Sequence, residues 1–205
     1  MPLQNRVTPF GEIVIDPSRG LLMGNRGILH DSDQRLGKSR WKHKNWVTCV
    51  LSFKGRKRPV MSPGKYTELF LMDEATALAA GHRPCAECRR QDFEKFVTAW
   101  IVGNQLDARP SAPALDAQLH SRRVTRTGER VTFTGRADSL PNGTMIAIGG
   151  EAWLVWHGQR HKWSFTGYGD CLPLDGTEVI VLTPLPIVGA LRGGYLPSVH
   201  ESVTQ

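Results

Sequence analysis

Two cysteines separated by two residues, Cys85 and Cys88, constrain the fold of this chain more than any other feature. This spacing lets both sulfurs bind one metal ion, and Pro84 stiffens the backbone just before the first of them. The arginines around the pair favour the thiolate, which is the form that binds zinc. Two thiolates make half of a tetrahedral site, so further ligands must come from elsewhere in the chain.

Helices are predicted on both sides of the pair. Residues 73–80 form an Ala-rich helix, with Asp73 as its N-cap and Gly81 as the glycine that ends it. Residues 89–102 form a second helix, because their apolar side chains recur three and four residues apart and make one continuous stripe. A redox-active cysteine pair favours a strand–helix–strand setting that this pattern lacks, so we interpret the pair as a zinc knuckle.

Short strands are predicted before and after this helical region, which makes the fold class α+β. The expected strands are 12–15, 46–53, 66–71, 144–148, 152–156, 160–165 and 178–182, and short helices are expected at 114–123 and 186–191. Gly149-Gly150 predicts a two-residue hairpin between two of these strands. The proline-containing loop 105–113 separates a basic zinc-binding domain, 1–104, from a small antiparallel β-rich domain, 114–205, unless the two pack as one unit.

Positive charge is concentrated in the first third of the chain. Residues 1–66 contain 13 Lys and Arg against 4 Asp and Glu, whereas residues 67–205 contain 13 against 15. No acidic residue occurs between Gln34 and Thr67, and aromatic residues such as Trp41 are interleaved with the cations there. Cations with interspersed aromatic rings suit a phosphate backbone with stacked bases, although a solvated basic surface has the same composition. We predict that this basic strip binds nucleic acid, DNA rather than RNA.

The predicted nucleic-acid contacts are the cations of the strip together with three arginines of the knuckle, which zinc would hold beside it. They are Arg35, Lys38, Arg40, Lys42, Lys44, Lys54, Arg56, Lys57, Arg58, Arg83, Arg89 and Arg90.

The remaining metal ligands are sought among the other cysteines and histidines. Cys49 lies on the inward face of the predicted strand 46–53, within the same basic part of the chain. Among the histidines, His30 is one candidate for a further ligand. Two alternatives stay open, His82, three residues before the first thiol of the pair, and Cys171, in a predicted turn of the other half.

The Ala-rich helix, Gly81-His82-Arg83-Pro84-Cys85 and Cys88 resemble the second half of the Ada-type metal-binding module of bacterial adaptive-response DNA repair proteins. The likeness covers about 25 of the 205 residues. The segment also resembles short zinc modules attached to bacterial nucleases, which carry Tyr-His-x-x-x-Cys before such a helix. His30 takes the place of that histidine, Gln34 stands where its cysteine is expected, and the early cysteine pair of the Ada-type module is absent. With the histidine that this resemblance implies, the predicted zinc site consists of Cys85, Cys88, Cys49 and His30. The resemblance implies zinc binding and a role in DNA repair or processing.

These features predict a zinc- and nucleic-acid-binding protein in which zinc is mainly structural, because sites with four protein ligands are typically structural. One alternative is an enzyme that acts on nucleic acid. It would be a metal-dependent hydrolase that uses His30, Asp31 or Asp33, or a thiolate that accepts a methyl group, as the Ada-type resemblance implies. Another alternative is a protein-interaction module whose basic surface meets an acidic partner.

Other features narrow the class of protein. No apolar run is long enough to span a bilayer, and residues 1–6 lack the apolar core of a secretory signal, so we expect a cytoplasmic protein with no membrane partner. Its four cysteines are then metal ligands or free thiols rather than a disulfide framework. No phosphate-binding glycine loop, dinucleotide fingerprint, His-Glu-x-x-His or Gly-x-Ser-x-Gly motif occurs.

Overall fold

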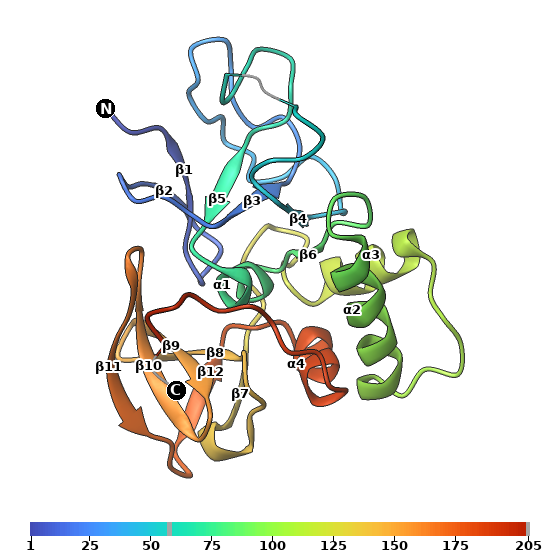
Figure 1. Cartoon of the computed structure of the whole chain (residues 1–205), viewed down its shortest axis with the longest axis vertical. Helices are drawn as coiled ribbons and strands as arrows, with labels where there is room; N and C mark the ends of the chain where they lie inside the picture. The colour runs from blue at the N-terminus through green and yellow to red at the C-terminus, as the bar shows by residue number, and fades with distance from the viewer. Residues whose placement is uncertain (57–58, 204–205) are drawn as a thin grey trace.

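A computed structural model describes residues 1–56 and 59–203, and it confirms the predicted α+β class (Figure 1). Within those residues it contains four α-helices and two six-stranded sheets. Two of the predicted nucleic-acid contacts, Lys57 and Arg58, lie outside the described residues. No helix in the described ranges combines the length and the apolarity that a membrane span requires.

The first sheet is mixed and comes from the N-terminal part of the chain. Its strands are β1 Gln4–Val7, β2 Ile13–Ile15, β3 Leu22–Asn25, β4 Val47–Cys49, β5 Leu69–Leu71 and β6 Arg83–Pro84. They lie in the order β2-β1-β5-β3-β4-β6, with parallel pairs β1–β5 and β4–β6. The predicted strand 46–53 contributes three residues to the sheet, because the chain bends away after Cys49.

Two helices follow β5 and frame the cysteine pair, as predicted. The first, α1 (Glu74–Ala79), is capped by Asp73, whose carboxylate accepts a hydrogen bond from the Thr76 amide at 2.8 Å. The chain then reverses at Gly81, whose φ of 85° is a left-handed value that favours glycine. The second, α2 (Arg90–Gly103), buries the predicted apolar stripe, and its most deeply buried side chains include Phe96 and Trp100.

The second sheet is antiparallel throughout and comes from the C-terminal part. Its strands are β7 Phe133–Arg136, β8 Met145–Ile148, β9 Glu151–Trp156, β10 Gln159–Ser164, β11 Gly167–Pro173 and β12 Glu178–Val181, in the order β11-β10-β9-β8-β12-β7. The predicted hairpin is confirmed, since Gly149 and Gly150 join β8 to β9 with φ of 59° and 83°. Residues 168–171, where a turn is predicted, belong instead to β11, and Cys171 pairs there with His161.

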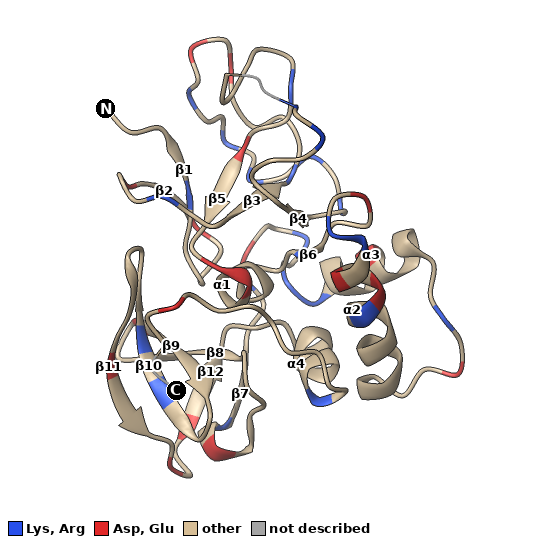
Figure 2. Ribbon diagram, viewed as in Figure 1, with Lys and Arg blue, Asp and Glu red and all other residues tan. Residues whose placement is uncertain are grey.

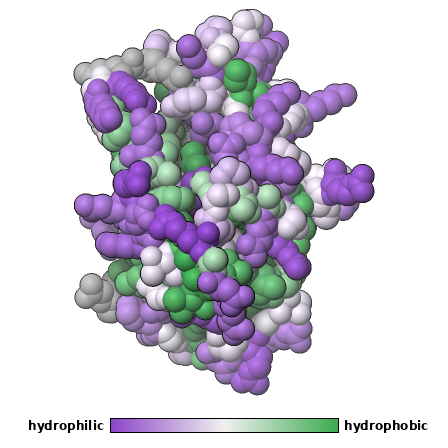
Figure 3. All heavy atoms as spheres, turned by 90° about the vertical axis from the view of Figure 1, so that its right-hand side faces the viewer, coloured by the Kyte–Doolittle hydropathy of each residue, from purple (hydrophilic) through white to green (hydrophobic). Residues whose placement is uncertain are grey.

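Two further helices, α3 (Ala112–Ser121) and α4 (Leu185–Arg192), and a short 3-10 turn, η1 (Ala137–Ser139), complete the fold. Helices α2 and α4 pack backbone to backbone, because a Cβ atom on Gly103 would overlap the carbonyl oxygen of Gly189. The face in Figure 3 is the right-hand side of Figure 1, where α2 and α3 lie. It is mostly hydrophilic, with hydrophobic atoms gathered in its lower half.

The hydrophobic core combines both halves of the chain. One buried cluster joins Phe96 and Trp100 of α2 to Leu191 of α4. A second joins Ala79 of α1 to Trp156 of β9. The two predicted domains therefore pack together through shared clusters, while the boundary between them stays a prediction.

The C-terminal part also holds the N-terminal end of α1. The Asp73 carboxylate accepts hydrogen bonds from the Tyr168 hydroxyl at 2.8 Å and from the His200 amide at 3.0 Å. The neighbouring Glu74 carboxylate accepts a hydrogen bond from the Tyr195 hydroxyl at 2.6 Å. Acidic side chains at this end complement the helix dipole, even though burial raises the pKa of Asp73.

Candidate metal centre

The pairing of β4 with β6 brings two of the predicted ligands together. In this parallel pair Thr48 is opposite Pro84, and the Cys85 amide donates a hydrogen bond to the Thr48 carbonyl at 2.9 Å. The next residue along each chain is a cysteine, so Cys49, the last residue of β4, and Cys85, the first residue after β6, lie side by side. The pairing, which links segments more than thirty residues apart in the sequence, thus builds one edge of the site.

Cys88 completes a cluster of three sulfurs. It lies in the turn that leads from β6 into α2, and the Sγ atoms of Cys49, Cys85 and Cys88 all lie within 4.8 Å of one another. Three sulfurs around one zinc ion at the usual Zn–S distance would be about 3.8 Å apart, so the set needs little movement to hold a metal. The Glu87 amide also donates to the Cys85 sulfur at 3.4 Å, which stabilises a thiolate there.

The three thiols share negative charge unequally. Hydrogen bonding from Cys49 is the main cause that lowers the pKa of Cys85 to about 5. The same hydrogen bond and burial raise the pKa of Cys49, and burial raises that of Cys88. Of the three sulfurs, Cys85 therefore loses its proton most readily, and the thiol protons of Cys49 and Cys88 are held more tightly. A dication would replace those protons and bind all three residues as thiolates.

The structure does not bring the predicted ligand His30 to this cluster. In the described chain, which includes every His, Cys, Asp and Glu, no fourth residue of these types joins the three sulfurs. His30 is buried elsewhere, with Nδ1 2.6 Å from the Thr67 hydroxyl and Nε2 3.2 Å from the Ser62 carbonyl oxygen. Its neighbours Asp31 and Asp33, proposed as partners in a hydrolase, lie in an exposed turn.

The two alternative ligands also lie outside the cluster. His82 is fully buried, and its Nε2 accepts a hydrogen bond from Nε of Arg26 at 3.2 Å. Cys171 is exposed on β11, where its sulfur is next to Gln159 and His161. The described residues thus supply three ligands, and a fourth position is left for water or an external ligand.

Most of the predicted nucleic-acid contacts are on the surface. The exposed ones are Arg35, Lys38, Arg40, Lys42, Lys44, Lys54, Arg56 and Arg90. In Figure 2 most of these cations colour the loops around β3, β4 and β6, in the part of the molecule that also contains the cysteines.

The prediction that zinc displays Arg83 and Arg89 on the surface is wrong, because both side chains are buried in ion pairs. Arg83 donates to both carboxylate oxygens of Asp116, each at 2.7 Å. Arg89 pairs with Glu74 at 2.8 Å and with the partly exposed Asp92 at 2.9 Å. Buried guanidinium groups need such partners, and these two arginines fix α2 and α3 around the knuckle.

A second group of buried arginines has no counterpart in the sequence-based predictions. Arg26 and Arg123 lie on either side of Trp46, with their guanidinium carbons 4.1 and 3.8 Å from a ring centroid. Arginine is rarely buried without a carboxylate, so nothing in the residue pattern indicates this arrangement.

No family model matches this chain, and comparisons with curated proteins and with solved structures give no match. The chemistry of the side chains is therefore the basis on which a function is assigned.

Proposed function

We propose that this chain is a zinc-binding protein that contacts nucleic acid, with zinc held by Cys49, Cys85 and Cys88. The observation that carries the proposal is the meeting of these three sulfurs within 4.8 Å. A set of thiolates favours zinc over magnesium or calcium, which prefer oxygen ligands. The ion would join the ends of β4 and β6 to the start of α2, so its role is mainly structural.

Exposed cations beside the centre support nucleic-acid contact. Phe53 lies in the loop after β4, with the Lys54 ammonium 5.1 Å and the Arg56 guanidinium carbon 5.4 Å from its ring centroid. Arg56 also pairs with Glu87 of the knuckle at 2.9 Å, which links this loop to the metal centre. Cations around a partly exposed ring suit phosphates with a stacked base. A role in DNA repair or processing, as the Ada-type resemblance implies, belongs to the same proposal.

Metal analysis of three purified proteins tests the zinc assignment. The natural chain should contain about one zinc ion, Cys49→Ser should contain far less, and Cys171→Ser should match the natural chain. Cys171 is the matched control because it is a free cysteine outside the cluster. Equal zinc content in all three proteins would show that the sulfurs do not bind the ion. Titration with a labelled DNA strand at several salt concentrations tests the proposed contact with nucleic acid. The absence of measurable binding at low salt would refute that contact.

The number of protein ligands supports a second candidate function, in which a cysteine thiolate accepts an alkyl group. Three protein ligands leave one position open, as in catalytic rather than structural zinc sites. The three cysteines are also only partly buried, so a reagent has a route to them. The thiolate would form a bond to the methyl carbon while the bond from that carbon to the phosphate oxygen breaks, which leaves a phosphodiester. Mass spectrometry after incubation with DNA that carries methyl phosphotriesters should then locate one added methyl group on Cys49, Cys85 or Cys88. An unmodified protein would leave zinc with the structural role alone.

A further inference from the structure

Three arginines converge on the C-terminal end of α1, about which the zinc proposal says nothing. Arg123 donates to the Gly81 carbonyl oxygen at 2.6 Å, Arg26 donates to that of Ala80 at 3.5 Å, and Arg130 donates to that of Ala79. The last carbonyl groups of a helix lack partners within the helix and carry partial negative charge. These arginines therefore satisfy the end of α1, each from a different segment of the chain.

The positive charge of this group exceeds what the helix end can neutralise. A helix terminus contributes about half an elementary charge, against three guanidinium groups. Within the described chain none of the three arginines has a carboxylate at ion-pair distance, and the Nε atoms of Arg123 and Arg130 are buried without a hydrogen-bond partner. Burial lowers the pKa of Arg123 to about 9 and of Arg130 to about 10, and that of Arg26 falls well below its ordinary value. A buried excess of this kind calls for an anion.

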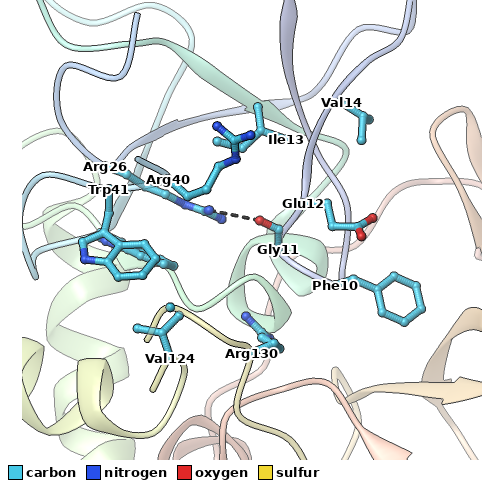
Figure 4. Close-up of a pocket in the computed structure, with 12 residues that line it drawn as sticks. Phe10, Gly11, Glu12, Ile13, Val14, Arg26, Arg40, Trp41, Val124 and Arg130 are labelled. Atoms are coloured by element: carbon cyan, nitrogen blue, oxygen red, sulfur yellow. Dashed lines mark hydrogen bonds between the residues drawn. The ribbon is translucent and has the colours of Figure 1, made fainter. Parts of the chain in front are cut away.

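A cavity of about 480 Å³ adjoins this group (Figure 4). Its lining includes Arg26, Arg130, the exposed Arg40, and the indole rings of Trp41 and Trp46. The volume falls within the range of roughly 300–1,000 Å³ that is usual for small-molecule sites. Glu12 is the one acidic residue of the lining, and in Figure 4 its carboxylate is directed away from Arg26 and Trp41. The cavity thus offers cations and a flat aromatic surface in one place.

We infer that this cavity binds a nucleoside phosphate, with the phosphate on Arg26, Arg40 and Arg130 and the base against Trp41. Two arginines held by backbone carbonyl groups present fixed donors to the phosphate, and the exposed Arg40 adds a third guanidinium group to the lining. The half-buried indole of Trp41 supplies a stacking surface for any base. A free mononucleotide and the phosphorylated end of a strand both carry this chemistry. The site does not depend on the zinc centre, because none of the three cysteines lines the cavity.

Binding measurements with matched ligands test the inference. Isothermal titration of the full chain should show that AMP binds at least about tenfold more tightly than adenosine, because only AMP meets the arginines. Adenosine that binds as well as AMP, or the absence of AMP binding, overturns the proposal. A 5′-phosphorylated oligonucleotide is then compared with its 5′-hydroxyl counterpart. A preference for the phosphorylated strand over AMP identifies a strand end as the ligand, and the reverse order identifies a free nucleotide.

Substitutions at the edge of the cavity test ligand binding without removing a fully buried side chain. Arg40→Ala should weaken AMP binding several-fold, since this exposed side chain otherwise donates only to the Gly37 carbonyl oxygen. Trp41→Leu should weaken AMP binding by roughly tenfold while leaving the binding of inorganic phosphate unchanged. Arg19→Ala is the matched control, because Arg19 is exposed, does not line the cavity and is not among the predicted nucleic-acid contacts. Equal loss in the control and in Arg40→Ala would assign the effect to general charge and refute the site. Zinc content, measured on the same samples, separates this result from the metal proposal.

Discussion

The amide of Cys85 donates a hydrogen bond to the carbonyl oxygen of Thr48, and this bond ties the first cysteine of the knuckle to the strand that ends at Cys49. It belongs to the short parallel pair β4–β6, which has only two residue pairs in register. So short a pair is weak alone, and a metal that bridges Cys49 and Cys85 would clamp it.

Metal removal should therefore loosen this pair before it loosens the rest of the fold. We expect a zinc chelator to speed hydrogen exchange at the Cys85 amide and in the first turn of α2, while the β8–β9 hairpin stays protected. A structural site worth several kcal/mol would also lower the melting temperature by on the order of 10 °C for a chain of this size. Restored protection after zinc is added back is the control, and unchanged exchange would contradict a structural role.

Loss of surface cations should weaken nucleic-acid binding in proportion to their number. Replacing Lys38, Lys42 and Lys44 with alanine should reduce the slope of log affinity against log salt by about 2 to 3, since each phosphate contact contributes about 0.7–0.9. The measurement is fluorescence anisotropy at several salt concentrations. The control replaces Lys95, Arg109 and Arg192, which are equally exposed but lie on or near α2 and α4. The surface is wrongly assigned if both triple variants behave alike.

The buried ion pair between Arg83 and Asp116 should be costly to break. Asp116→Asn leaves a buried guanidinium group without its counter-charge, and we expect the free energy of unfolding to fall by about 3–5 kcal/mol. Replacing both residues with apolar side chains of similar size, Arg83→Met with Asp116→Leu, should recover most of this loss. Denaturant unfolding measures both, and Asp138→Asn in the exposed pair with Arg136 should have a far smaller effect.

His120 should contribute to a loss of stability in mild acid. Its Nδ1 accepts a hydrogen bond from Arg123 at 3.0 Å, and burial together with that guanidinium group lowers the pKa of His120 to about 4. The unfolded chain protonates this histidine near pH 6.5, so the folded state loses stability as pH falls from about 6.5 towards 4. His120→Gln should lose less stability than the natural chain over this interval. His157→Gln, at an exposed position, should follow the natural chain, and identical profiles for all three would remove His120 as the cause.

Short-range sequence patterns predicted the helices α1 and α2 and the β8–β9 hairpin. The stripe of Phe96 and Trp100 predicted α2 to within one residue, and the cap at Asp73 predicted α1. Gly149-Gly150 predicted its hairpin because a type I′ turn needs positive φ at both positions. In each case the determining residues are close neighbours in the sequence.

Short-range patterns do not predict which distant strands pair, and the metal centre depends on the pairing of β4 with β6. Cys49 was proposed because cysteines are few, whereas its place beside Cys85 follows from the β4–β6 register. His30 was proposed from a resemblance, but its ring bonds Thr67, a residue no spacing connects with it. Arg83 and Arg89 were placed on the surface because zinc was expected to hold the knuckle beside the basic strip, and only the fold reveals their buried carboxylate partners.

The six residues of α1 have a consequence for synthesis of the chain. So short a helix is not stable alone, and its two ends are fixed by Arg130 on one side and by Tyr195 and His200 on the other. During translation the N-terminal sheet and the cysteines leave the ribosome long before those residues do. We therefore expect a nascent chain stalled before Tyr195 to remain protease-sensitive throughout, including at the metal centre, and to become resistant only when His200 has emerged.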